Sequence, residues 1–312
     1  MKTVVLSVCG FIMIALIMTL VNYENLISFI PVRSHSQVTG AQEKPKQPQS
    51  EPLRPVTNDT ISYTLQNNAL NITYDNGKSW VKVPVEQAQL FAGEYNGNKQ
   101  ELIDGSYLLT KYRTAFLHSA GSNPKNKRIV FTYSLDQGKT WHHSTVTASF
   151  TALRFRKTAF INEHFGYVII SGDRTMSQES SRVFLTQDGG RSWKETASTG
   201  VTQLISDGGF VNESTGFLSY GTINPENPEL YVTEDGGKSW SKAVFTMPQK
   251  YLKIFVTAEI PTREGNRLAV LVNQGPNGDY EGGKVNGKFI SENNGRTWTF
   301  SEEVQPDENQ QE

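Results

Sequence analysis

The chain has 312 residues, a formal net charge of -1 and 11% aromatic residues. This length allows one or two domains with a sizeable core, and the balanced charge carries no electrostatic footprint for nucleic acid. The single cysteine, Cys9, excludes an intramolecular disulfide and favours a bacterial exterior over a eukaryotic secretory route.

The N-terminal segment is predicted to be a membrane anchor. Residues 4–21 form an uncharged run that would span roughly 27 Å as a helix, close to the ~30 Å of a hydrocarbon core. Lys2 makes residues 1–3 a cytoplasmic stub and places the rest of the chain outside. The alternative is a cleaved signal segment, although the first small-residue triplet comes late, at residues 34–36. We therefore expect a single-pass protein of the cell membrane with an extracytoplasmic C-terminal domain, or a secreted protein if the segment is cleaved.

Two polar segments flank the predicted folded domain. Residues 22–59 are rich in proline and glutamine and have little apolar surface to bury in their second half, so they are predicted to form a flexible linker. Residues 305–312 are predicted to be a disordered acidic tail. The folded domain is expected over residues 60–304.

One eight-residue pattern, [ST]-x-[DN]-x-G-[KR]-[ST]-W, occurs five times in this domain and contains all five tryptophans. The copies are TYDNGKSW (73–80), SLDQGKTW (134–141), TQDGGRSW (186–193), TEDGGKSW (233–240) and SENNGRTW (291–298). A repeat of roughly 50 residues is typical of a propeller or a solenoid. Although the copies contain Gly-Lys-Ser, the glycine that a phosphate-binding P-loop needs five residues earlier is missing.

Each copy is predicted to be a hairpin turn between two strands, because alternating apolar residues precede it and a short strand follows. The glycine supplies a positive φ, the Asp or Asn accepts turn hydrogen bonds, and the tryptophan packs under the turn. A ligand or metal role for the acids is the alternative, but Asn293 in the fifth copy carries no charge, which favours a structural role. The predicted structural residues are Asp75, Gly77, Trp80, Asp136, Gly138, Trp141, Asp188, Gly190, Trp193, Asp235, Gly237, Trp240, Asn293, Gly295 and Trp298.

These copies resemble the Asp-box, or BNR repeat, of the sialidase superfamily. The resemblance covers about residues 61–304 and implies an all-β protein, a β-propeller in which each box joins the third and fourth strands of a blade. We expect five blades of roughly 49 residues each, preceded by one transmembrane helix. The first blade is incomplete: either it has three strands, or residues 87–112 contribute something irregular.

Sialidases of this superfamily use a Tyr–Glu nucleophile pair, an aspartic acid and three arginines, the first of them in a Phe/Tyr-Arg-Ile-Pro motif. Here the nearest candidate is PLRPV with Arg54, which lacks the motif, so no catalytic residue is assigned. Alternation places Arg154 and Arg156 on one strand face, where they form a candidate anion site. The alternative is that they pair with neighbouring acids or lie at a solvated rim. Other polar residues show no catalytic spacing: His142, His143, Asp173, Tyr280 and Glu281.

The sequence therefore favours a membrane-anchored extracytoplasmic propeller that acts as a binding or scaffold module for an unknown protein or glycan ligand. The alternative is an exo-sialidase-like glycoside hydrolase that acts on extracellular glycans. No cofactor, metal, nucleic acid or disulfide partner is predicted.

Overall fold

The computed structural model describes residues 52–94, 97–121, 123, 126–221 and 224–305. These residues lie in one compact unit, Ser50–Glu312. The predicted anchor over residues 4–21 and most of the predicted tail lie outside the described residues. No helix of the described part is long and apolar enough to cross a membrane.

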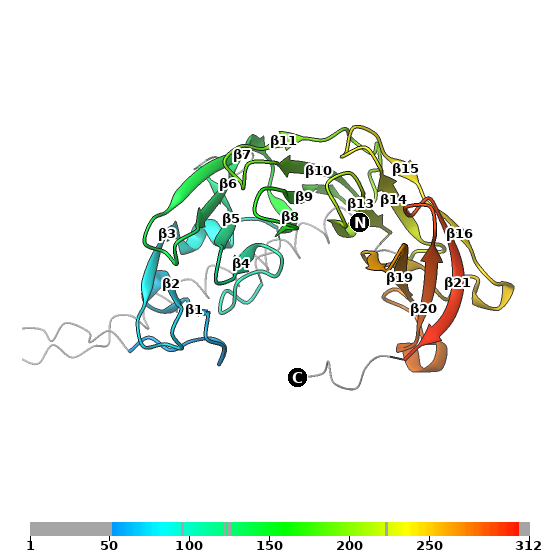
Figure 1. Ribbon diagram of the computed structural model, residues 1–312, viewed down its shortest axis with the longest axis horizontal. Coiled ribbons are helices and arrows are strands. Elements are labelled where there is room, and N and C mark those ends of the chain that lie inside the picture. The colour runs from blue at the N-terminus through cyan, green and yellow to red at the C-terminus, as the bar shows by residue number, and fades with distance from the viewer. Residues whose placement is uncertain (1–51, 95–96, 122, 124–125, 222–223, 306–312) are drawn as a thin grey trace, which may run out of the picture. The chain divides into compact units, whose positions relative to one another are not determined.

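The described chain folds into five successive β-sheets, here named sheets A to E, and the all-β prediction is confirmed (Figure 1). Sheet A contains β1 (Ser62–Thr64), β2 (Ala69–Thr73) and β3 (Val81–Glu86). Sheet B contains β4 (Tyr107–Leu109), β5 (Thr114–Ala120), β6 (Lys127–Ser134) and β7 (His142–Phe150). Sheet C contains β8 (Leu153–Phe160), β9 (Gly166–Thr175), β10 (Gln178–Thr186) and β11 (Lys194–Glu195). Sheet D contains β12 (Ile205–Phe210), β13 (Gly216–Tyr220), β14 (Glu229–Thr233) and β15 (Ser241–Lys242).

Sheet E is the most elaborate. It contains β16 (Val244–Thr246), β17 (Thr257–Ala258), β18 (Thr262–Glu264), β19 (Arg267–Asn273), β20 (Asn286–Ser291) and β21 (Thr297–Val304). All its pairs are antiparallel except that of β16 with β21, which is parallel. The described helices are short: η1 (Gln66–Asn68), α2 (Gln87–Leu90), η2 (Gln249–Tyr251) and η3 (Tyr280–Gly283).

The sheets are held together by apolar cores that each belong to two consecutive sheets. Phe131 of sheet B packs in one core with Val168 of sheet C, and Tyr167 of sheet C packs in another with Leu218 of sheet D. Further shared cores join sheet A to sheet B and sheet D to sheet E. Two of the second strands, β5 and β13, are buried at every residue. A strand covered on both faces needs a continuous rather than an alternating run of buried side chains, which is what their sequences contain.

Sheet A has three strands, which is one of the two alternatives that the sequence left open. Residues 54–57 lie along β1: the Val56 N–H donates to the Tyr63 carbonyl at 2.9 Å, and the Thr57 N–H donates to Ser62 Oγ at 3.1 Å. This part of the predicted linker therefore occupies the edge where the other sheets have their first strand. Among the described strands, no sheet combines the two ends of the chain.

Candidate functional site

The five Asp-boxes are the hairpins that precede the last strand of each antiparallel meander. They join β6 to β7, β10 to β11 and β14 to β15, the third and fourth strands of sheets B, C and D. In sheet A the box joins β2 to β3, and in sheet E it joins β20 to β21. A common geometry recurs although the sheets differ in size.

The acid of each box closes its own turn. In the third box, Asp188 Oδ1 accepts from the Ser192 N–H at 2.9 Å and from Thr186 Oγ1 at 2.8 Å, and Oδ2 accepts from Ser192 Oγ at 2.6 Å. Asp75, Asp136 and Asp235 repeat these contacts within 0.1 Å. The hydrogen bonds from Ser79 and then Thr73 lower the pKa of Asp75 to about 2, because they favour the ionised carboxylate. Each of these four acids is therefore committed to its turn.

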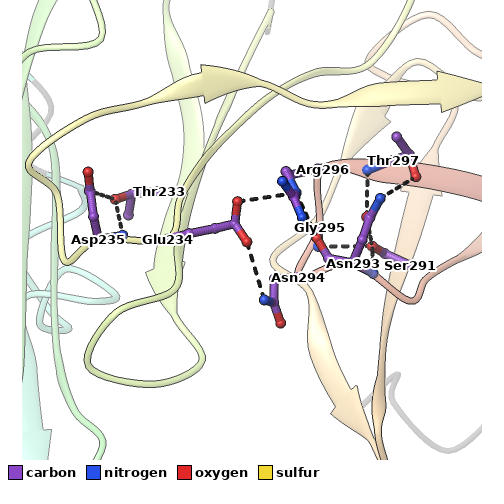
Figure 2. Close-up of polar contacts among 9 residues, drawn as sticks. All are labelled: Thr233, Glu234, Asp235, Ser291, Asn293, Asn294, Gly295, Arg296 and Thr297. Atoms are coloured by element: carbon purple, nitrogen blue, oxygen red, sulfur yellow. Dashed lines mark hydrogen bonds and ion pairs between the residues drawn. The ribbon is translucent and has the colours of Figure 1, made fainter.

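The fifth box reaches the same geometry without a charge (Figure 2). Asn293 Oδ1 accepts from the Thr297 N–H and from Ser291 Oγ, both at 3.0 Å. Asn293 Nδ2 then donates to Thr297 Oγ1 at 2.9 Å, so the hydroxyl accepts where the serine of an acidic box donates. The turn thus needs two acceptor contacts and one further hydrogen bond, not an ionised group.

Neighbouring boxes also contact each other and the preceding sheet. Glu234, next to the acid of the fourth box, forms an ion pair with Arg296 of the fifth box, 3.3 Å from Nε, and accepts a hydrogen bond from Asn294 Nδ2 at 3.2 Å (Figure 2). Gly237 has φ +79°, and a Cβ placed there would lie 2.4 Å from Thr196 of the preceding sheet. A larger residue would therefore force the two sheets apart.

The tryptophans differ in burial, which sequence alone did not predict. Trp298 is fully buried, whereas the other four are partly exposed. The Trp193 indole donates to Ser144 Oγ at 3.0 Å, and that hydroxyl donates to the Gly190 carbonyl. By contrast, the buried indole N–H groups of Trp141, Trp240 and Trp298 have no hydrogen-bond acceptor. Ring packing, rather than a hydrogen bond, holds those three side chains.

The two arginines of the candidate anion site do not point to a shared ligand position. Arg154 forms an ion pair with Glu179 through Nε and Nη2 and donates to the Ile205 carbonyl at 2.6 Å. Arg156 donates to the carbonyls of Leu90 in α2 and of Ala92 just after it, both at 3.0 Å. These residues lie between sheets A and B in the chain, whereas Ile205 belongs to sheet D. A β-bulge between Leu153 and Phe155 shifts the register here, so simple alternation does not hold. The anion site remains a prediction that this geometry disfavours.

Three of the remaining polar residues named from the sequence, His142, His143 and Tyr280, have contacts within the protein. The His143 ring bonds to Thr132 Oγ1 at 2.8 Å, while the His142 ring packs on Tyr133, so the two histidines diverge. Tyr280 donates to Glu303 at 3.1 Å rather than to its neighbour Glu281, and Tyr251 donates to the same oxygen of Glu303. Among the described residues, no group of three His, Cys, Asp or Glu side chains could hold a metal.

An open cleft of about 580 Å³ lies between sheets B and C, beside the third Asp-box. Its walls are mostly apolar and aromatic, formed by Leu108, Tyr112, Tyr133, Leu135 and Phe160, with Arg113 and Arg191 among them. We call it the B–C cleft. Tyr112 is 74% exposed, Leu135 is 47% exposed, and Ile161, next to Phe160 in the chain, is 40% exposed. The volume is in the range of small-ligand sites.

The Arg113 guanidinium lies against a wall of this cleft. It is 9% exposed, lies 3.8 Å from the centre of the Phe160 ring, and donates to the carbonyls of Gly189 at 2.8 Å and Glu163 at 2.9 Å. Burial lowers the pKa of Arg113, with Tyr133 and Glu163 opposing the shift. Its stacked position fixes the shape of the cleft as well as its charge.

A second cleft, of about 600 Å³, is lined by residues of the segment before β4 and by β8. Glu94, Glu101 and Asp104 form its acidic side, and Arg154, Arg156 and Arg174 its basic side. We call it the acidic–basic cleft. No ion pair within the described part of the chain joins these acids to these arginines. Since Arg154 and Arg156 are engaged elsewhere, Arg174 is the arginine with the most capacity left for an outside anion.

The Asp-box geometry agrees with a comparison of the sequence with known families. The model of the BNR/Asp-box repeat matches residues 132–143, which contain the second box. This match identifies the second box as a BNR/Asp-box repeat, and the four further copies form the same kind of hairpin.

Solved structures provide further similarities. The chain is similar to a protein of unknown function from Dyadobacter fermentans, with 15% identity and a TM-score of 0.41 over 69% of this chain and 64% of that one. It is similar to a GH74 xyloglucanase from Xanthomonas campestris, with 12% identity and a TM-score of 0.41 over 77% and 36%. It is also similar to Trypanosoma rangeli sialidase in complex with sialic acid, with 11% identity and a TM-score of 0.37 over 67% and 40%. The chain thus spans less than two thirds of the length of each. No protein of curated function matches it.

Proposed function

We propose that this chain is a five-bladed Asp-box β-propeller, tethered outside the cell by its N-terminal segment, that acts as a binding or scaffold module. Sheets A to E would be the blades, because each carries one box and each shares a core with the next. The ligand would be a protein or a glycan.

The B–C cleft is the observation that carries a binding role. Seven large apolar side chains are exposed among the described residues; two of them, Tyr112 and Leu135, line this cleft, and a third, Ile161, lies in the chain between the lining residues Phe160 and Asn162. Exposed apolar groups that gather at one concave site mark an interaction surface. The acids that line the cleft do not form a free pair, because Asp188 is bonded into its box. A glycosidase normally needs two available carboxyl groups.

The second candidate function is glycoside hydrolysis, which the acidic–basic cleft favours. Three carboxylates and Arg174 line one concave site there, which is the set of groups that acid–base attack on a glycan requires. The B–C cleft would then be a surface for holding substrate or partner, and not the reaction centre.

A hydrolysis assay on the purified full chain separates the two functions. We expect no release of product from fluorogenic α-sialosides or β-xylosides, since two of the three arginines of this cleft, Arg154 and Arg156, are bonded within the protein. Variants Glu101→Gln and Asp104→Asn serve as matched probes of the acidic side. Turnover that is lost in either of these variants, while Glu213→Gln at an exposed turn keeps it, would overturn the binding proposal in favour of a hydrolase.

The membrane tether rests on residues 4–21, which lie outside the described residues. We expect the protein isolated from its native membrane to keep its original N-terminus and to extract only with detergent. N-terminal sequencing together with carbonate extraction measures this. A new N-terminus beyond residue 30 and release without detergent would replace the anchor with a secreted form.

A further inference from the structure

Arg113 and Arg191 line the B–C cleft, and Lys111 lies beside it, with Nζ 5.9 Å from the centre of the Tyr112 ring. Within the described residues, no ion pair involves Lys111, Arg113 or Arg191. Arg113 is the unusual member, because its buried guanidinium contacts two carbonyl groups and the rings of Phe160 and Tyr133, and the Glu163 carboxylate stabilises its charge only from a distance. A buried cation that has no carboxylate in contact is poorly compensated, so it attracts an anion that enters the cleft.

The acids around the cleft leave this positive charge in excess. Asp188 has both carboxylate oxygens bonded within its turn. Glu163 is exposed and lies beyond ion-pair distance from Arg113. Against these two acids stand Arg113 and Arg191 of the lining and Lys111 next to the Tyr112 ring, and His164 also lines the cleft. The site therefore favours an anionic ligand over a neutral one.

The apolar part of the site comes from three separate turns. Tyr112 lies between β4 and β5, Leu135 is the second residue of the second Asp-box, and Ile161 begins the turn after β8. Sugar rings stack on aromatic faces, but the exposed leucine and isoleucine call for an apolar side chain as their partner. The cleft is open to solvent, so an extended chain can cross it without closure of a lid.

We propose that the B–C cleft binds an acidic polypeptide segment of a partner protein that carries one aromatic or aliphatic anchor residue. The anchor packs between Tyr112 and Leu135, and flanking carboxylates face Lys111 and Arg191. Arg113 supplies the buried positive charge behind them. This inference rests on the proposed binding function and gives it a site and a partner chemistry.

The test uses a display library of random dodecapeptides selected on the full chain. We expect the enriched peptides to contain Asp or Glu on either side of an aromatic or aliphatic residue. The best of them, made synthetically, should bind with an affinity that falls steeply as salt rises, because exposed charges are screened. Exchange of its acids for lysine, or of its anchor for serine, should each weaken binding by about tenfold or more.

Exposed positions supply variants that leave the fold intact. Tyr112→Ala and Arg191→Glu should each weaken binding of the selected peptide by about tenfold or more. Lys238→Glu is the matched control, because Lys238 occupies in the fourth box the place that Arg191 has in the third, and lies outside the cleft. Met176→Ala, at a side chain 91% exposed in the turn between β9 and β10, controls for loss of an apolar group. Both controls should bind as the parent does.

Several outcomes would overturn this inference without touching the proposed function. They are enrichment of basic peptides, no enrichment at all, or equal loss of binding in the Lys238→Glu control. Displacement of the peptide by an acidic oligosaccharide at lower concentration than by the peptide itself would assign the cleft to a glycan instead. The hydrolysis assay reports on the proposed function independently, so failure of the one is distinguishable from failure of the other.

Discussion

Trp298→Ala is expected to destabilise the protein more than any other single change in the Asp-boxes. Removal of a buried tryptophan costs about 3–5 kcal/mol, a large share of the ~5–15 kcal/mol that a domain commonly has. Trp298 is fully buried and packs against two rings. The distance between ring centres is 5.9 Å to Phe245 of its own sheet and 6.2 Å to Phe217 of sheet D. Its loss would therefore loosen two sheets at once. Trp193→Ala should cost less, since Trp193 is partly exposed and leaves a cavity that water can reach.

The acids of the same boxes allow a graded comparison by thermal melting. Asp188→Ala removes the acceptor of the Ser192 N–H and should lower the melting temperature clearly, because an unsatisfied partly buried donor costs about 1–3 kcal/mol. Asp188→Asn should be milder, since Asn293 already completes the fifth box with an amide. The expected order is Trp298→Ala, then Asp188→Ala, then Asp188→Asn. Full stability of Asp188→Asn together with loss of ligand binding would show instead that the carboxylate charge is functional.

Glu179→Gln is expected to be the most damaging change of a single charge. Its side chain is fully buried and accepts from Arg154 and from the Ile205 N–H at 2.7 Å, so it ties β8 and β10 of sheet C to sheet D. The variant leaves the Arg154 charge without its carboxylate. Breaking a buried pair in this way costs about 3–5 kcal/mol, and the lower value applies here because the Arg154 side chain is 19% exposed. Urea unfolding of the variant and the parent measures the difference.

A second pair in the same sheet supplies the control. Arg182 and Glu195 are bonded through two contacts, at 2.6 and 2.5 Å, but their side chains are 28% and 44% exposed. Glu195→Gln should therefore change the free energy of unfolding by about 1 kcal/mol or less. The double variant Arg154→Leu with Glu179→Leu should recover much of the loss, since it removes both charges. Equal effects of Glu179→Gln and Glu195→Gln would contradict a structural role for the buried pair.

The Asp-boxes show how much of this protein can be predicted from its sequence. Their hydrogen bonds join residues two and four positions apart, as between Thr186, Asp188 and Ser192, so the eight-residue pattern contains nearly all the partners it needs. The prediction that each box joins the third and fourth strands of a sheet is likewise confirmed in sheets B to D. What the pattern missed is the role of its first residue. The Thr186 hydroxyl accepts from the Gly190 N–H at 2.9 Å and donates to Asp188, which follows from the same spacing.

The candidate sites, by contrast, depend on contacts that the sequence does not state. The partner of Arg154 is 25 residues away, and the bulge at that position defeats the strand alternation on which the anion site was based. The parallel pairing of β16 with β21 joins segments that lie on either side of four strands of sheet E. A hint existed for the B–C cleft, because Lys111, Tyr112 and Arg113 are adjacent in a turn, where an aromatic side chain has little to pack against.

The sequence by itself determined that this is an all-β chain built on five Asp-box hairpins, because those turns are closed by local hydrogen bonds and by a glycine conformation that no distant residue supplies. Only the tertiary structure decided which charged groups are available to a ligand. Arg154 is bonded to Glu179 and Asp188 to its own turn, while buried Arg113 forms no ion pair with any described acid. The availability of a charge depends on which side chains two neighbouring sheets bring within hydrogen-bond reach. Residues from segments far apart in the chain set that distance, and the composition of each strand does not encode it.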